Sequence, residues 1–280
     1  MTLSTYQFSF NGLTFGAGTT YIIENIDGLG GSSPIRNQDD NRGYIDGSYS
    51  GRDFYDGRTV TFDMVIIGDG THNAQYYYKQ LQSKLAPQQL GYYPNAYNDA
   101  NSIAQPSGTL GLFQFQLTTD SFSGDTSVTG IRRMWGRARL ITTPIDPDFT
   151  FGYIVTTVEF FFPDPRYYDD TAKAPTSSTS VSLANNGWAI SCPLIVISSP
   201  SASVAITDSS NSAYSMNFLN VTTGVPLVID LLQRTITQNG ISARNTLNTV
   251  VNWMALPPNY STTWTSSVGS MAITYRNAYI

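Results

Sequence analysis

The single histidine and the single cysteine of this 280-residue chain are its first candidates for nucleophilic or metal chemistry. His72 follows Asp69 by three residues, but no Gly-x-Ser-x-Gly context accompanies it, so a Ser-His-Asp triad is not predicted. Cys192 lies in the apolar segment AISCPLIVI, where a buried, inert thiol is expected. One histidine and one cysteine are too few for a zinc cluster. We therefore expect no catalytic residue, no metal site and no intramolecular disulfide.

Aspartates between positions 39 and 56 could supply the two carboxylates of a glycosidase. Their Gly and Asn neighbours are typical of turns instead. The segment DDNRGYIDG superficially resembles a calcium loop, but its glycine is the fifth residue from Asp39 and no Glu stands at the twelfth. Glycine patterns for nucleotide binding are missing too. The sequence predicts no cofactor, and it favours a binding or assembly protein over an enzyme.

The charged residues are few and unusual in kind. There are 15 Lys+Arg against 20 Asp+Glu, with 12 Arg to 3 Lys and 18 Asp to 2 Glu, whereas helical surfaces favour Glu and Lys. Tyr, Thr, Val, Ser and Gly predominate, which is typical of strands joined by short turns. The net charge of −5 argues against binding of duplex DNA, which needs a dense cationic surface. We expect a mainly β protein.

The first residues, MTLSTYQFSFNGLTFG, lack a basic region followed by an apolar run, and no stretch approaches the ~18 apolar residues of a membrane span. We therefore expect neither Sec export nor membrane insertion. The lone thiol fits a reducing compartment.

Alternation of apolar and polar residues predicts five strands before residue 170, and one segment between them has helical spacing instead. The helix is expected at 72–86, with Thr71 as N-cap and Pro87 as its end. The strands are expected at 6–10, 60–68, 110–118, 131–142 and 152–162, the last two joined by a turn at 144–148.

The chain divides at a small, polar segment. Residues 28–58 are rich in Gly, Asp and Arg with little periodicity, which predicts an extended arm or a loop ordered by a partner. DDTAKAPTSSTS at 169–180 has no large apolar residue and is the predicted linker. Residues 1–170 carry a net charge of −7 and 171–280 a net charge of +2, and seven strand-like segments follow at about ten-residue spacing. We expect a domain over 1–170, a linker over 171–180 and a β-sandwich over 181–280.

Several segments in order resemble the distal tail (Dit) proteins of siphophages, including those called minor tail proteins. Their order and spacing over nearly the whole chain carry the resemblance, because each alone is only turn residues and a strand. They are YIIENIDGLGGSSPIRNQDDNRGYIDGS, GRTVTFDMVIIG, YYYKQLQSKLAP, FFFPDPRYYDD, NNGWAISCPLIVI, GVPLVIDLLQRTITQNGIS and AITYRNAYI.

The resemblance implies a β-barrel-like belt domain with one α-helix and a galectin-like C-terminal β-sandwich. It further implies a hexameric ring at the tail tip of the virion, assembled in the cytoplasm of the bacterial host. The implied partners are the tail tube protein, the tail-associated lysin or hub protein, and receptor-binding proteins. DNA would pass through the ring without specific binding.

Two other functions remain open. The C-terminal sandwich could be a carbohydrate-binding module in which Trp188, Trp253 or Trp264 stacks on a sugar ring, although residues 171–280 lack the histidine that galectin sites use. Tail tube subunits have related barrels and are the second alternative, but a separate sandwich after residue 180 favours a distal tail protein.

Candidate interface residues lie in the strand IRRMWGRARLI at 131–141. Strand alternation places Arg133, Trp135, Arg137 and Arg139 on one face, and Met134, Ala138 and Leu140 on the core face. One interpretation is a solvated face with the arginine stems packed over Trp135. The other is pairing of Arg133, Arg137 and Arg139 with carboxylates of an adjacent subunit, for which the arm offers Asp39, Asp40 and Asp46.

Overall fold

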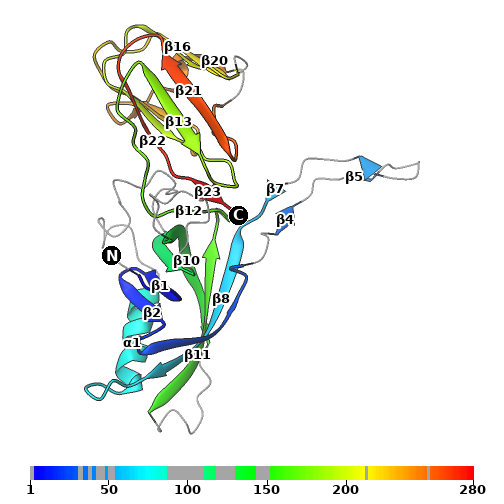
Figure 1. The fold of residues 1–280 in the computed structure, drawn as a ribbon, viewed down its shortest axis with the longest axis vertical. Helices are drawn as coiled ribbons and strands as arrows, with labels where there is room; N and C mark the ends of the chain where they lie inside the picture. Colours follow the sequence, from blue (N-terminus) through cyan, green and yellow to red (C-terminus); the bar gives the residue numbers. More distant parts are fainter. Residues whose placement is uncertain are drawn as a thin grey trace.

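A computed structural model describes residues 3–30, 34–36, 40–41, 48–49, 54–86, 110–117, 130–142, 152–211, 214–250 and 253–280. Within these ranges the chain is mainly β with one α-helix, which confirms the predicted fold class. The strands build an N-terminal and a C-terminal module, with β12 (Tyr167–Asp169) and β23 (Ala278–Tyr279) between them (Figure 1).

The N-terminal module is one antiparallel sheet in the order β2-β1-β9-β10-β11-β8-β3. All five strands predicted before residue 170 are present, and β10 pairs with β11, although the turn predicted at 144–148 lies outside the described residues. The strands are β1 (Gln7–Phe10), β2 (Leu13–Gly16), β3 (Tyr21–Asp27), β8 (Arg58–Ile67), β9 (Gly111–Gln116), β10 (Arg132–Thr142) and β11 (Tyr153–Phe162).

This sheet folds over on itself without closing. β1 and β8 are separated by three strands in the sheet order, yet the rings of Phe8 and Phe62 lie 5.2 Å apart. The rings of Phe10 and Phe160 make a similar contact at 5.0 Å. Among the described strands, β2 and β3 end the ladder and no hydrogen-bonded pairing joins them, so the curvature is barrel-like but no closed barrel is present.

The helix α1 (Ala74–Leu85) packs against β8 and β11. It begins two residues after the predicted start, because the N-cap is Asn73 and not Thr71: the Asn73 side chain accepts a hydrogen bond from the Tyr76 amide. Its buried residues are Ala74, Leu81 and Leu85, as the helical spacing predicts.

Four short strands occupy the predicted arm. β4 (Ile35–Arg36) pairs with β7 (Phe54–Tyr55), and β5 (Asp40–Asn41) pairs with β6 (Ser48–Tyr49). Both pairs project away from the body of the N-terminal module (Figure 1). The described part of the arm is thus a two-stranded ribbon.

The C-terminal module is a sandwich of two five-stranded antiparallel sheets. One sheet has the order β13-β21-β15-β16-β20 and the other β19-β18-β17-β14-β22, and alternate residues of both point into a shared aliphatic core. The elements are β13 (Ser180–Asn185), β14 (Leu194–Ile197), β15 (Ser203–Asp208), β16 (Ser215–Leu219), β17 (Leu227–Asp230), β18 (Thr235–Gln238), β19 (Ile241–Ser242), the 3-10 turn η2 (Arg244–Thr246), β20 (Leu247–Val250), β21 (Tyr260–Ser266) and β22 (Met271–Thr274).

Candidate functional site

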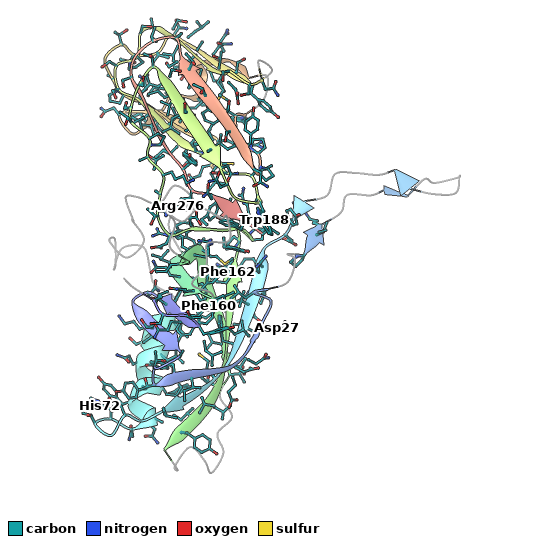
Figure 2. All side chains as sticks on the ribbon, viewed as in Figure 1. Asp27, His72, Phe160, Phe162, Trp188 and Arg276 are labelled. Atoms are coloured by element: carbon teal, nitrogen blue, oxygen red, sulfur yellow. The ribbon has the colours of Figure 1, made fainter. Side chains whose placement is uncertain are left out.

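His72 and Asp69 do not form a catalytic pair. The Asp69 carboxylate accepts hydrogen bonds from the Tyr77 hydroxyl at 2.6 Å and from the backbone amides of Thr71 and His72. The Tyr77 hydroxyl, followed by these amides, lowers the pKa of Asp69 to about 2. The His72 ring stacks on Tyr76 with centroids 4.0 Å apart. These contacts organise the turn before α1, at the end of the N-terminal module far from the C-terminal module (Figure 2).

Cys192 is half-buried beside Arg166. Burial raises the pKa of its thiol, and this effect exceeds the lowering caused by the Arg166 guanidinium. A thiol with a raised pKa is a poor nucleophile at neutral pH. The described residues hold no cluster of three or more His, Cys, Asp or Glu that could bind a metal. None of the helices in the described ranges is long and apolar enough to cross a membrane.

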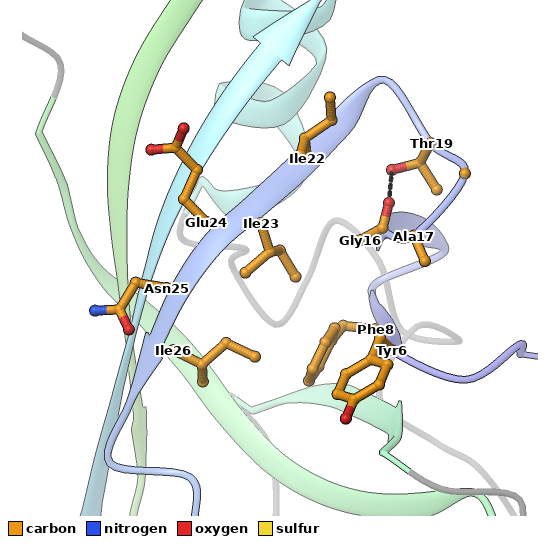
Figure 3. A pocket seen from close by; sticks show the side chains of 11 residues that line it. Tyr6, Phe8, Gly16, Ala17, Thr19, Ile22, Ile23, Glu24, Asn25 and Ile26 are labelled. Carbon is orange, nitrogen blue, oxygen red and sulfur yellow. Dashed lines mark hydrogen bonds between the residues drawn. The ribbon is translucent and has the colours of Figure 1, made fainter.

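Two open grooves mark the surface. One of about 630 Å³ lies between the β2 end and β3, and Glu24 is the sole titratable carboxylate that lines it (Figure 3). The other, of about 720 Å³, crosses the C-terminal module and is lined mostly by small and hydroxyl side chains, with Lys173 and Tyr275. The first groove is thus lined mainly by apolar residues, and the second by hydroxyl side chains beside one lysine.

The three tryptophans considered for sugar stacking have different environments. Trp264 is fully buried, and its indole nitrogen donates to Asp208 at 3.1 Å. Trp253 is partly buried against the C-terminal core. Trp188 is 69% exposed, at the level of the module junction (Figure 2). Of the three rings, Trp188 alone presents a face to solvent.

The arginines predicted to share one face of β10 are divided in the structure. Arg133 is buried, and its guanidinium donates to Asp170 of the same chain at 2.7 and 2.9 Å. Arg137 and Arg139 are exposed, with guanidinium carbons 5.8 and 4.6 Å from the centroid of the Phe161 ring. A β-bulge between Ala138 and Leu140 interrupts the alternation on which the sequence argument relied.

The predicted acidic partners fall in the arm. Asp39 and Asp46 lie outside the described residues. The backbone of Asp40 pairs with Tyr49 in the projecting ribbon, and its side chain is outside the description too. The proposed pairing between the arginines of β10 and these aspartates therefore stays a prediction.

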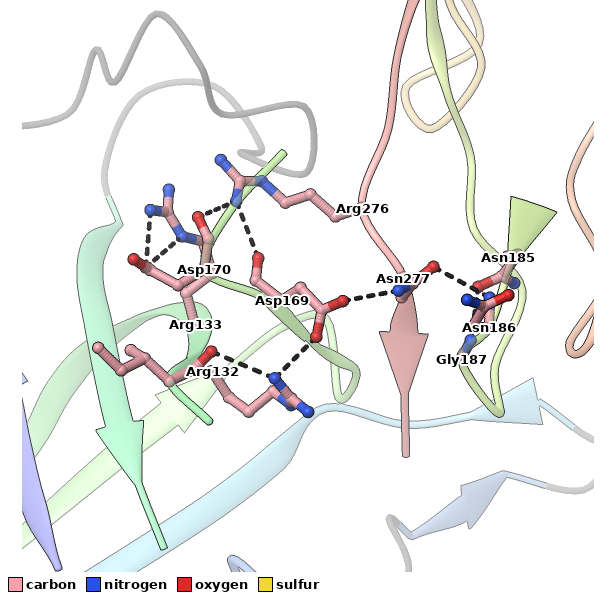
Figure 4. A network of polar contacts seen from close by, with 10 residues as sticks. Arg132, Arg133, Asp169, Asp170, Asn185, Asn186, Gly187, Arg276 and Asn277 are labelled. Carbon is pink, nitrogen blue, oxygen red and sulfur yellow. Dashed lines mark hydrogen bonds and ion pairs between the residues drawn. The ribbon is translucent and has the colours of Figure 1, made fainter. Parts of the chain in front are cut away.

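A network of buried charges at the module junction was not predicted from the sequence. Arg132 forms an ion pair with Asp169 at 2.8 Å, and both side chains are almost fully buried. Asp169 accepts a second hydrogen bond from Asn277 at 2.7 Å, and Arg276 donates to the backbone carbonyls of Asp169 and Asp170 (Figure 4).

One sequence signal could have revealed part of this network. Arg132 and Arg133 are adjacent, as are Asp169 and Asp170, and adjacent residues in strands point to opposite faces. Antiparallel pairing of β10 with β12 then gives each face one arginine and one aspartate, as observed. The contribution of Arg276 and Asn277, over a hundred residues away, has no such signal.

Comparison with known proteins gives a family for the C-terminal module. Residues 186–279 match the family described as siphovirus-type tail component, C-terminal domain. The C-terminal module is therefore similar to the C-terminal domain of siphovirus-type tail components. No curated protein sequence matches the chain.

Solved structures extend the similarity to the N-terminal module. The crystal structure of the Dit protein (gp 19.1) of phage SPP1 has 16% sequence identity and a TM-score of 0.64, with 99% of this chain and 100% of that one covered. That protein is described as a paradigm of the hub adsorption apparatus in phages that infect Gram-positive bacteria. Two baseplate structures of phage P2 have 10% identity and TM-scores of 0.48 and 0.45, and 96% of this chain and 97% of each of those chains are covered. The similarity to SPP1 Dit shows a shared fold over both modules.

Proposed function

We propose that this chain is a structural, non-enzymatic protein of a siphophage tail tip that forms a hexameric ring between the tail tube and the baseplate. The match of residues 186–279 to a siphovirus tail component is the observation that carries the proposal. The shared fold with SPP1 Dit over 99% of the chain supports a distal tail protein over a tail tube subunit. The proposed neighbours are the tail tube protein, the tail-associated lysin or hub protein, and receptor-binding proteins.

The N-terminal module has features that favour self-association. β2 and β3 are edges of its sheet, and an unpaired strand edge is a ready partner for another chain. The projecting arm exposes Ile35 and Tyr55, which are 61% and 52% accessible. Large apolar side chains on a projecting ribbon are typical of segments that become buried in an assembly.

Charge supports the passage of DNA through such a ring without binding. Residues 1–170 have a net charge of −7, so a ring built from them carries few cations to hold phosphates. We expect the lumen to be neutral to acidic. A ring structure with a lumen dominated by Arg and Lys would contradict this part of the proposal.

The first test is the mass of the purified full-length protein by native mass spectrometry, with particle images by electron microscopy. The proposal expects a closed ring of about six 30.7-kDa subunits. A stable monomer that binds glycans in an array would instead support a carbohydrate-binding module, with Trp188 as the residue to substitute.

A charge reversal tests the predicted interface on β10. Replacing Arg137 and Arg139 together by Glu should weaken ring assembly by about 2–5 kcal/mol if both pair with carboxylates of a neighbour. The measurement is the concentration at which the ring dissociates at physiological salt. The matched control replaces Arg234 and Arg244, exposed residues of the C-terminal module, by Glu and should leave assembly unchanged. Equal effects of the two double variants would assign the effect to net charge alone.

A further inference from the structure

The predicted linker is one half of a two-stranded connection between the modules. β12 pairs with β23 through Tyr167 with Tyr279 and Tyr168 with Ala278. The same two segments stay antiparallel beyond the strands, because Lys173 bridges Tyr275 and Ser178 bridges Met271. Residues 167–178 and 271–279 therefore cross the junction side by side (Figure 1). A paired ribbon resists rotation that a single polar linker allows.

The residues that close this ribbon on the N-terminal side are all buried. Arg276, Asn277, Ala278 and Tyr279 are each no more than 2% exposed. The Tyr279 ring stacks on Tyr167 with centroids 5.5 Å apart, and the Arg132 guanidinium lies 4.7 Å from the Tyr279 centroid. We call residues 276–279 the closing segment.

The closing segment also bonds to the C-terminal module. The Asn277 side chain accepts a hydrogen bond from the Asn186 amide at 3.0 Å while it donates to Asp169. The Ala189 amide donates to the Ala278 carbonyl at 2.9 Å. A Cβ on Gly187 would lie 2.2 Å from that carbonyl oxygen, so the backbones are in close contact there. The segment thus fastens the two modules to each other.

Neither module depends on the closing segment for its main core. The aliphatic core of the C-terminal sandwich includes Tyr275 and no residue of 276–279, and the phenylalanine core of the N-terminal module includes none of them either. Their own apolar contact is the small cluster of Ala278 with Trp135, Tyr168, Ala189 and Leu110. The segment can therefore separate while both main cores stay packed.

The polar groups of the closing segment lower the free-energy cost of its separation from β12. Arg276 and Asn277 are held by carbonyls, by an amide and by Asp169, and these groups recover hydrogen bonds to water when the segment leaves. The desolvation penalty of buried charges is also relieved on exposure. An equally buried apolar segment would recover neither. Partial opening at such a polar contact is the kind of local transition that native proteins undergo.

We propose that residues 276–279 are a latch that sets the orientation of the C-terminal module. When the latch is paired with β12, the two-stranded connection holds the module in one orientation. When it separates, residues 173–178 stay paired with 271–275 of the C-terminal module, so the module turns at residues 171–172, where the connection is a single segment. The latch is a property of one chain and does not require the ring.

The test measures the distance between the modules in the full chain. Spin labels are attached at Ser83→Cys on α1 and Ser203→Cys on β15, both exposed residues, with Cys192→Ser to remove the native thiol. The labelled protein with an intact latch should give one narrow distance distribution. Asn277→Ala, and a chain ending at Tyr275, should each broaden it, because only the single segment 171–172 then joins the N-terminal module to the paired residues 173–178 and 271–275.

Limited proteolysis provides a second readout. The rate of cleavage at residues 171–172, which the open latch leaves as a single segment, follows the population of the open state when opening is fast. Asn277→Ala should raise this rate about tenfold, since a buried hydrogen-bonding side chain is lost. Asn25→Ala is the matched control, because Asn25 is exposed on β3 and its hydrogen bond to Asp63 is long, at 3.4 Å. Its distance distribution and cleavage rate should equal those of the unmodified chain.

Two results would overturn the latch. One is an unchanged narrow distribution in a chain that ends at Tyr275 and retains the circular dichroism of both modules. The other is an unchanged cleavage rate in Asn277→Ala, which decides the question if the shortened chain does not fold.

Discussion

The two modules fill their interiors with different side chains. The N-terminal core is built around eight buried phenylalanines, whereas the C-terminal core is mostly Val, Leu, Ile and Met with one tryptophan and one buried phenylalanine. A single sheet that folds over on itself encloses a wide space, which large rings fill with few residues. Two sheets packed face to face leave a thin layer that aliphatic side chains fill. The composition of each core follows from how its sheets meet.

Two glycines of the N-terminal sheet leave room for the phenylalanine rings of its core. Gly136 of β10 and Gly111 of β9 are register partners. A Cβ on Gly136 would lie 2.4 Å from the Phe162 ring, and a Cβ on Gly111 would lie 2.6 Å from the Phe10 ring. The aromatic core therefore requires glycine at these positions of β9 and β10, because a side chain there would collide with the rings.

The largest expected effect is at the centre of the phenylalanine core. Phe113 has six phenylalanine rings within 6.2 Å, and Phe113→Ala should lower the free energy of unfolding by about 3–5 kcal/mol. Urea denaturation measures it. Tyr55→Ala removes an exposed ring from the arm and should change stability by less than ~0.5 kcal/mol. Similar losses in both variants would show that the rings are not tightly packed.

A smaller effect is expected in the C-terminal core. Trp264→Phe keeps a buried ring but removes the donor to the Asp208 carboxylate, which is itself buried. Loss of that donor should cost about 1–3 kcal/mol in chemical denaturation of the full chain. Trp188→Phe alters an exposed ring and serves as the control. If the two variants were equally stable, the Asp208 contact would contribute nothing to this module.

The smallest expected effect is a difference between the modules in how stability depends on pH. Tyr77 and backbone amides lower the pKa of Asp69, so its stabilising contribution is present above the ordinary aspartate pKa and is lost as pH falls towards about 2. Burial raises the pKa of Asp230 in the C-terminal module. Its ionised form is disfavoured in the folded state, so stability decreases as pH rises from the ordinary aspartate pKa through the raised one.

Melting temperatures between pH 2 and pH 6 measure this contrast. The difference between the unmodified chain and Asp69→Asn should shrink at the acid end, where Asp69 becomes protonated. The difference for Asp230→Asn should move in the opposite direction. A common trend in both variants would contradict the opposed environments of the two carboxylates.

Local pattern was sufficient to predict five strands and the helix of the N-terminal module, but it did not predict β2 and β3. Alternation along 60–68 and 152–162 predicted β8 and β11, because each strand buries one face. The helix was predicted to within two residues. Its N-cap was assigned to Thr71, but Asn73 is also a residue type that caps helices, and the backbone geometry places the Asn73 side chain on the Tyr76 amide.

The candidate interface was less predictable. Alternation put Arg133, Arg137 and Arg139 on one face, but Arg133 is buried in an ion pair with Asp170 whereas Arg137 and Arg139 are exposed beside Phe161, and a bulge follows Ala138. A bulge inserts one residue without any composition signal. The position of an ion pair depends on which strands become neighbours, which a strand's own sequence does not encode.

By itself the sequence determined that the chain is mainly β, where five strands and the helix of the N-terminal module lie, and that it has a single histidine and a single cysteine. These follow from composition and short periodicity, which act over a few residues. Tertiary structure alone decided that residues 276–279 return to β12, that Arg132 and Asp169 are buried together, and that the predicted linker is paired. Arg132 and Asp169 are 37 residues apart and the other contacts join segments about a hundred residues apart, and their free energy comes from burial and hydrogen bonds that exist only once both modules have folded.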